Sequence, residues 1–136
     1  MRRRWCWALM MLPMMALPLI VDAATGAWSD SVSGPTLSVR GNWRMTPALQ
    51  APSSASGTIT VVNWRYQLSR PAPSGLIVRL CAGQRCVEIE GGSGSTRSLA
   101  TIAADETLHL AFGFQGQGAL PPGLRVVSSQ VTVNYQ

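Results

Sequence analysis

The chain has 136 residues, with 11 arginines, no lysine and six acidic residues, and its formal net charge is +5 at pH 7. Three of the arginines are adjacent at positions 2–4, and the others are scattered along the sequence. Because nucleic-acid-binding proteins usually gather their cations on one face, a nucleic-acid partner is not expected. The length suits one domain with its own core rather than two.

The N-terminal segment has the pattern of a secretory signal. An uncharged stretch from Trp5 to Val21, rich in Met, Leu and Ala, follows the three arginines and ends at Asp22, Ala23 and Ala24. A basic start, an apolar middle and a small-residue end are typical of a cleavable signal peptide. The sequence therefore predicts a signal peptide over residues 1–23, helical in the precursor, and a single exported domain over residues 24–136.

A retained membrane anchor is the competing interpretation of this segment. Its apolar run is at the short limit for spanning a bilayer, and Pro13 and Pro18 interrupt it. Cleavage is therefore favoured, and no stable membrane anchor is expected in the mature protein.

The rest of the chain shows period-two alternation and β-branched residues but no convincing helical period. Turn-forming segments rich in Gly, Pro and Ser separate the alternating runs, and Gly91–Ser95 is expected to be a flexible link. A bulge, or a strand buried on both sides, is expected near Val61, where the apolar face of the longest run changes side. This pattern predicts an all-β fold, an antiparallel β-sandwich, immunoglobulin-like or related, of about seven to eight short strands. The predicted strands are Thr36–Arg40, Thr58–Arg70, Leu76–Cys81, Cys86–Glu90, Ser98–Ile102, Thr107–Phe114 and Leu124–Tyr135.

Two of these runs are predicted to form a hairpin closed by a disulfide. Cleavage of the signal removes Cys6 and leaves Cys81 and Cys86, and an even pair in an exported protein usually forms a disulfide. Two thiols and the single His109 are one ligand short of a closed zinc site, so no metal or other cofactor is expected. With Cys81 opposite Cys86, the register pairs Leu80 with Val87, Arg79 with Glu88, and Val78 with Ile89.

This register sorts the hairpin side chains by type. The apolar pairs fall on one face, predicted to be the core, while the cysteines and the Arg79–Glu88 pair fall on the outer face. A slip of one residue would bring Arg79 among the apolar groups, so the register is strongly specified.

Catalytic machinery is not apparent in the sequence. His109 lies on the strand face opposite Leu108 and Leu110 and is expected to face solvent. No serine has the setting of a nucleophile elbow, and the glycines of Gly91–Gly94 lack the residues of a phosphate-binding loop. An enzyme is therefore not expected. A small hydrolase, the alternative, would require His109 within hydrogen-bond reach of an acid and a nucleophile.

Binding surfaces are the remaining source of function, because exposed aromatic and Arg side chains are common anchors. Trp28 and Trp43 lie in segments of weak periodicity and are expected to be exposed, whereas Trp64 and Tyr66 are more simply explained as core. A carbohydrate- or peptidoglycan-binding module is an alternative that predicts two or more coplanar exposed rings among Trp28, Trp43 and Tyr66. The candidate interaction residues are Trp28, Arg40, Trp43, Arg44, Trp64, Tyr66 and Tyr135.

Three strings in the chain carry a resemblance to a known family: NWRYQL (Asn63–Leu68), PSGLIVRLCAGQRCVEIEG (Pro73–Gly91) and VTVNYQ (Val131–Gln136). Together with their order along the chain, they resemble the flagellar protein FlhE family. The resemblance implies a periplasmic location in Gram-negative bacteria and a non-enzymatic accessory role in flagellar assembly and type III export. That role is either to limit proton leakage through the export gate or to act as a chaperone for flagellar components. The implied partners are export-gate or rod and assembly proteins.

Three surfaces are expected to contact such partners: the Thr58–Arg70 strand, the terminal Val131–Tyr135 strand and the residues around Trp43. An unpaired strand edge among them would be able to accept a strand from a client protein.

Overall fold

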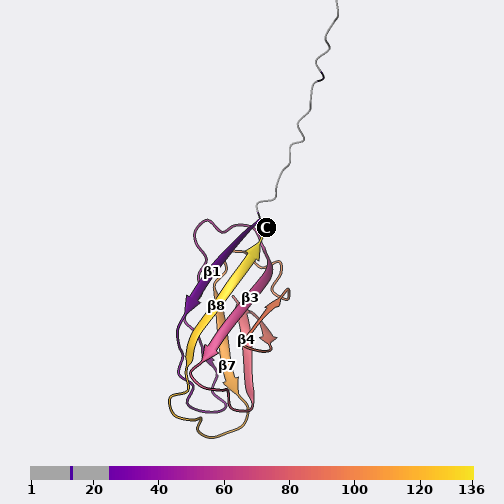
Figure 1. Ribbon diagram of the computed structural model, residues 1–136. Coiled ribbons are helices and arrows are strands. Elements are labelled where there is room, and N and C mark those ends of the chain that lie inside the picture. The colour runs from indigo at the N-terminus through magenta and orange to yellow at the C-terminus, as the bar shows by residue number, and fades with distance from the viewer. Residues whose placement is uncertain (1–12, 14–24) are drawn as a thin grey trace, which may run out of the picture.

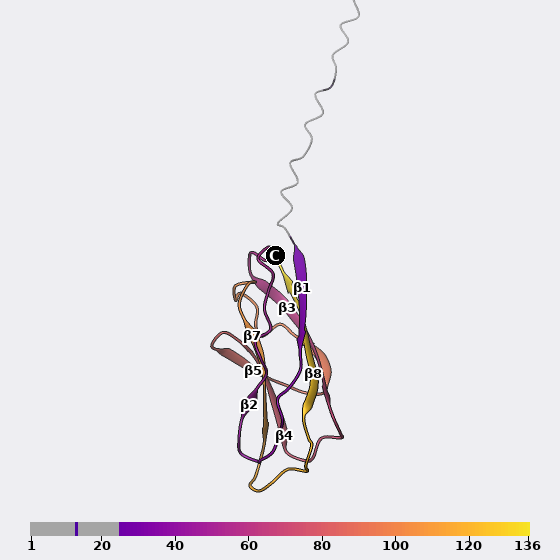
Figure 2. The same cartoon turned by 90° about the vertical axis from the view of Figure 1, so that its left-hand side faces the viewer.

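The computed structural model describes residue 13 and residues 25–136, so the predicted signal peptide lies outside the described residues except for Pro13. Residues 25–136 form eight strands in two four-stranded antiparallel sheets. Figure 1 shows one sheet in front of the other, and Figure 2 shows the two layers from the side. The prediction of an antiparallel β-sandwich of seven to eight strands is confirmed.

The first sheet has the strand order β1-β8-β3-β6. Its central strand β8 pairs with β1 on one side and with β3 on the other. The bounds are β1 Gly26–Val32, β3 Ile59–Leu68, β6 Ser93–Thr96 and β8 Val126–Tyr135. The terminal strand is therefore interior to its sheet, as is β3, so neither of these two expected contact surfaces is an edge strand.

The second sheet has the strand order β2-β7-β4-β5. Strand β7 lies between the short β2 and β4, and β5 forms the opposite edge. The bounds are β2 Arg44–Met45, β4 Leu76–Ala82, β5 Arg85–Ile89 and β7 Leu108–Phe114. Among the described residues, no helix is long and apolar enough to cross a bilayer.

The β4–β5 hairpin has the predicted register. Cys81 pairs with Cys86, Arg79 with Glu88, and Val78 with Ile89, and the two cysteines form a disulfide with their Cα atoms 4.0 Å apart. Val78 and Ile89 are buried, as expected for the core face. Cys86 is exposed, but Cys81 on the same outer face is buried.

The position of the disulfide follows from the ladder. The N–H of Gly83 donates to the carbonyl of Thr107, and the N–H of Gln115 donates to the carbonyl of Gly75. In β4, the odd-numbered residues therefore direct their backbone N–H and C=O groups toward β7, and the even-numbered residues direct theirs toward β5. Cys81 and Cys86 therefore form a non-hydrogen-bonded pair across the hairpin. Such pairs bring Cα atoms closest together in antiparallel sheets, which suits a direct sulfur bridge.

The expected bulge near Val61 is also confirmed. Ile59 pairs with Tyr135 and Val61 with the adjacent Asn134, so Thr60 has no partner of its own in β8. The extra residue reverses the side-chain alternation, which lets both Ile59 and Val62 point into the core.

Two predicted strands are not formed. Thr36–Arg40 makes only isolated bridges, with Leu37 buried and Val39 exposed. Residues 98–102 form a turn in which Thr101 has a φ of 74°, a left-handed conformation that a strand cannot contain. Leu99 is nevertheless fully buried, so this turn supplies a core side chain without joining a ladder.

The expected flexible link at Gly91–Ser95 is wrong, because β6 begins within it. Gly94 of β6 pairs with Trp64 of β3, and a Cβ atom on Gly94 would lie 2.6 Å from Cζ2 of the indole. Glycine has low strand propensity, but here only glycine leaves room for the ring.

The core lies between the sheets and joins strands with loops. Tyr66 of β3 meets Phe112 of β7 edge to face, with ring centroids 5.2 Å apart. Twelve large side chains are almost completely buried: Phe112, Leu49, Ile59, Leu80, Leu99, Leu108, Leu110, Leu124, Val62, Val126, Val131 and Val133.

The disulfide is expected to contribute modestly to stability because it closes a very short loop. Replacing both cysteines, Cys81→Ala with Cys86→Ala, should lower the free energy of unfolding by about 2 kcal/mol. Urea denaturation of the purified protein measures this difference. As a control, dithiothreitol should destabilise the wild type and leave the double variant unchanged; equal urea midpoints for the two proteins would contradict the expectation.

Candidate interaction surface

Trp43 is the most exposed aromatic side chain on the outer face of the second sheet. Its side chain is 43% exposed, and it lies directly before β2. The indole covers Gly113 of β7, where a Cβ atom would lie 2.8 Å from Cδ2 of the ring. Because glycine has no side chain, the ring lies flat against the sheet instead of extending into solvent.

Arg79 of β4 stacks on the same indole. Its guanidinium carbon lies 4.5 Å from the ring centroid, well within the range of a cation–π interaction. Arg79 is paired with Glu88 in the ladder as predicted, but its guanidinium contacts Trp43. The interaction fixes both side chains on the outer face.

The large apolar side chains that are exposed in the described part of the chain are Val39, Trp43 and Met45, at 46%, 43% and 52%. Met45 pairs with Ala111 of β7, as Arg79 does from β4, and the indole of Trp43 lies on Gly113, so these three side chains lie on the outer face of the second sheet. We call Trp43, Met45 and Arg79 the Trp43 surface. A separate hollow of about 100 Å³ brings Val39 next to the exposed Arg44, but neither Trp43 nor Met45 lines it.

Arg40 has a structural role beside this surface. Its Nη1 donates to the carbonyls of Ser74 and Gln115, at 2.8 and 3.1 Å, and its guanidinium lies 5.8 Å from the ring of Phe114. It therefore ties three segments together at one end of the sandwich. Of the two candidate arginines near Trp43 in the sequence, Arg40 is therefore engaged within the fold, whereas Arg44 is exposed.

The expectation that Trp28 is exposed is wrong. Trp28 is 4% exposed and its Nε1 donates to the carbonyl of Ala104 at 2.8 Å. It belongs to β1, a strand that sequence reasoning misses because its small and polar residues alternate weakly. Pairing of Trp28 with Val133 turns the indole into the core.

The other three candidate aromatic residues are buried or half-buried. Trp64 is buried and its Nε1 donates to the carbonyl of Gly91, and Tyr66 lies half-buried against Phe112, in keeping with the expected core positions. Tyr135 is half-buried, with its ring against Gly26 of β1. Trp28, Trp43 and Tyr66 therefore do not form the coplanar exposed platform that a carbohydrate-binding module needs.

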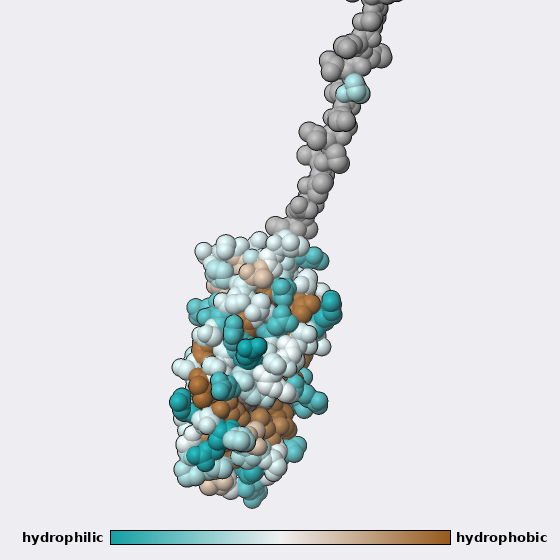
Figure 3. All heavy atoms as spheres, in the orientation of Figure 1, coloured by the Kyte–Doolittle hydropathy of each residue, from teal (hydrophilic) through white to brown (hydrophobic). Residues whose placement is uncertain are grey.

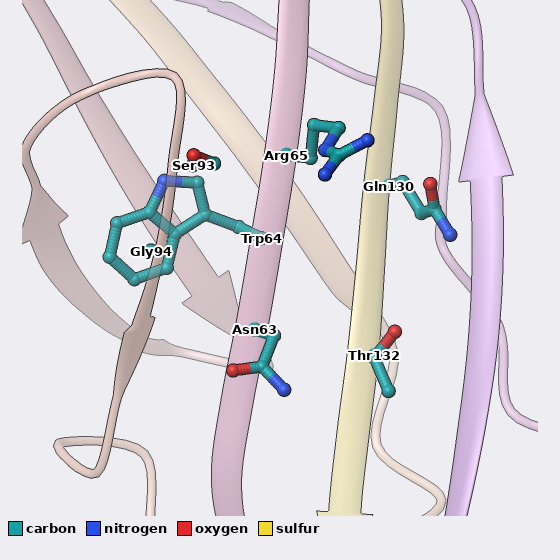
Figure 4. A pocket seen from close by; sticks show the side chains of 7 residues that line it. All are labelled: Asn63, Trp64, Arg65, Ser93, Gly94, Gln130 and Thr132. Atoms are coloured by element: carbon teal, nitrogen blue, oxygen red, sulfur yellow. The ribbon is translucent and has the colours of Figure 1, made fainter.

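A second hollow, of about 380 Å³, lies on the outer face of the first sheet. Figure 4 shows Asn63 and Arg65 projecting from β3 and Gln130 and Thr132 from β8, while the ring of Trp64 lies beside Gly94. The lining is thus made of amide, hydroxyl and guanidinium groups. The covered indole leaves no aromatic face for stacking.

His109 is half-buried rather than facing solvent as expected. Its Nδ1 lies 2.9 Å from the backbone carbonyl oxygen of Thr46, which fixes this nitrogen as the protonated donor. The hydrolase alternative required an acid and a nucleophile within hydrogen-bond reach of His109. The partner of Nδ1 is instead a backbone carbonyl. Within residues 25–136, no three His, Cys, Asp or Glu side chains gather as a metal site would require.

Sequence comparison identifies the family of this chain. A protein-family model described as flagellar protein FlhE matches residues 34–136. A flagellar protein FlhE from Salmonella typhimurium is 44% identical over 98% of this chain and 99% of its own length. Its counterpart from Escherichia coli is 46% identical over 93% and 98%. The chain belongs to the FlhE family.

Structural comparison agrees. A crystal structure of FlhE superposes with a TM-score of 0.80 at 46% identity, covering 84% of this chain and 99% of its own. The matched FlhE region contains the whole Trp43 surface and the β4–β5 hairpin. The resemblance seen in the three sequence strings is therefore confirmed.

Sequence reasoning misses Met45 and Gly113 as parts of the surface. No pattern distinguishes Met45. The signal for Gly113 is present, since a glycine between Phe112 and Phe114 in a strand often marks a site where another group approaches the backbone closely.

Burial raises the pKa of Tyr66 above its usual value near 10.0, because ionisation would place a charge in the partly desolvated core. The unfolded chain then ionises first as the pH rises, so the stability contributed by Tyr66 is present below about pH 10 and is lost above it. The variant Tyr66→Phe should show a smaller decrease in the free energy of unfolding over this range. Urea denaturation at a series of alkaline pH values measures it, and identical pH dependence in the two proteins would rule out this role.

Proposed function

We propose that this protein is a periplasmic, non-enzymatic accessory factor of flagellar assembly and type III export that acts by binding other proteins. Membership of the FlhE family supports the flagellar role. The N-terminal signal pattern and the Cys81–Cys86 disulfide support export, because disulfides persist mainly in oxidising compartments.

The observation that carries the binding proposal is the Trp43 surface. Protein interfaces are enriched in Trp, Met and Arg, and their strongest anchors are side chains already held in the bound geometry. The indole of Trp43 lies against Gly113, and the guanidinium carbon of Arg79 lies 4.5 Å from the ring centroid. Little side-chain entropy remains to be lost when a partner covers the ring, so this residue is our choice of anchor.

Two mechanisms fit a binding protein of this kind. In one, it contacts the export gate and limits proton leakage through it; in the other, it holds flagellar rod or assembly components before they are incorporated. The half-buried His109, with Nδ1 engaged by Thr46, gives no reason to assign it a proton-carrying role in the first mechanism. In both mechanisms, the protein acts through the surface that contacts its partner.

The proposal is tested by complementing a deletion strain. We expect Trp43→Ala to reduce swimming motility and the recovery of flagellar proteins by crosslinking, because truncation of an interface anchor typically costs at least about 2 kcal/mol of binding energy. Gln130→Ala, an exposed change on the other sheet, is the matched control and should behave as the wild type. Cell fractionation in the same strains should place the processed protein in the periplasm.

Two results would contradict the proposal. Full motility with Trp43→Ala, at wild-type protein levels, would exclude the Trp43 surface as the functional contact. Recovery of no flagellar protein with the wild-type chain would contradict the binding role itself.

A further inference from the structure

One end of the sandwich is left open on the side of the β5 and β6 edges. The β5 ladder stops where Ile89 pairs with Val78, whereas β4 begins two residues earlier, at Leu76. The β6 ladder stops at the pair of Ser93 with Arg65, although the N–H of Tyr66 still donates to the carbonyl of Gly92, and β3 continues to Leu68. Leu76 of β4 and Leu68 of β3 therefore have no ladder partner on this side, while β7 and β8 pair with them on the other.

The two uncovered strand ends border one cavity of about 390 Å³, which we call the open groove. Figure 3 shows apolar surface at this end of the molecule, beyond the end of β3. The groove is deep enough to reach the core, since Val78 and Ile89 are core residues. Its lining includes Tyr66, Leu76, Val78, Glu88, Ile89 and Glu90.

Two carboxylates border the open groove. Glu88 and Glu90 are exposed, and the natural counter-ion in the ladder, Arg79, lies on Trp43 instead. Within residues 25–136, neither carboxylate forms an ion pair shorter than 4.0 Å with an arginine. A chain whose net charge is positive thus presents a local negative site beside exposed apolar surface.

The geometry of β5 defines what fits there. Glu88 and Glu90 alternate with the inward-facing Ile89, so the two carboxylates share the outer face. An extended segment continuing the line of β5 alongside Leu76 would direct alternate side chains into the groove and the others to the face of the carboxylates. Apolar side chains suit the first set and lysine or arginine suits the second.

We propose that the open groove binds an extended segment of a partner protein in which apolar residues alternate with Lys or Arg. Backbone hydrogen bonds to the N–H and C=O of Leu76, the residue of β4 left unpaired on this side, add to the affinity as they do in strand addition, and the groove and carboxylates provide the selectivity. The inference rests on the proposed function in taking the ligand to be a protein, but it uses a different surface from Trp43.

The test is an NMR titration of the purified protein with a blocked heptapeptide in which lysine alternates with valine. We expect the largest amide shifts at Leu76–Val78 and at Tyr66–Leu68. The joint variant Glu88→Gln with Glu90→Gln should bind roughly 4- to 25-fold more weakly, from two exposed charge pairs. The matched control Asp105→Asn removes an exposed carboxylate elsewhere and should bind normally, as should Trp43→Ala.

Several results would overturn the proposal. These are the absence of shifts at millimolar peptide, equal binding of a peptide with glutamate in place of lysine, and equal binding by the double Gln variant. Shifts at the same amides that depend on protein concentration without peptide would show that a second copy of the chain occupies the groove. Because the assay is independent of motility, its failure would leave the test with Trp43→Ala in cells unaffected.

Discussion

The pairing of Cys81 with Cys86 in the β4–β5 ladder determines the direction of each side chain in the hairpin. It directs Val78 and Ile89 into the core, and it places Arg79 on the outer face within reach of Trp43. Because Arg79 stacks on the indole, it forms no ion pair with Glu88. One register therefore produces both an aromatic–cationic surface and an acidic groove.

The sheet order explains why binding surfaces occur where they do. Strands β8 and β7 have neighbours on both sides; β7 buries six of its seven residues, and Gln130 is the one exposed residue of β8. The short strands β2 and β6 cover their neighbours only in part, and β5 ends before β4 does. Exposed apolar groups lie next to these incomplete edges, so short edge strands, which natural proteins use to limit aggregation, here also leave room for a partner.

The sequence was sufficient to predict the sandwich and the hairpin. The alternation of apolar and polar residues, and the matching of residue types across the hairpin, are local signals that repeat over several positions. It was insufficient where tertiary contacts override local preference. Gly94 has poor strand propensity, yet β6 forms because the ring of Trp64 needs a residue without a side chain. Trp28 lies in a weakly alternating segment, yet it is buried by pairing with β8. Likewise, a ladder partner of opposite charge did not guarantee an ion pair, because the guanidinium of Arg79 lies on Trp43.

The most direct test of the proposed stacking is the NMR chemical shift of the Arg79 side-chain protons. A guanidinium on the indole predicts a pronounced upfield ring-current shift that disappears in Gly113→Ala, where the new Cβ atom displaces Trp43. Arg79 resonances at ordinary positions, insensitive to Gly113→Ala, would show that the guanidinium does not lie on Trp43 and would contradict the link between the hairpin register and the two surfaces.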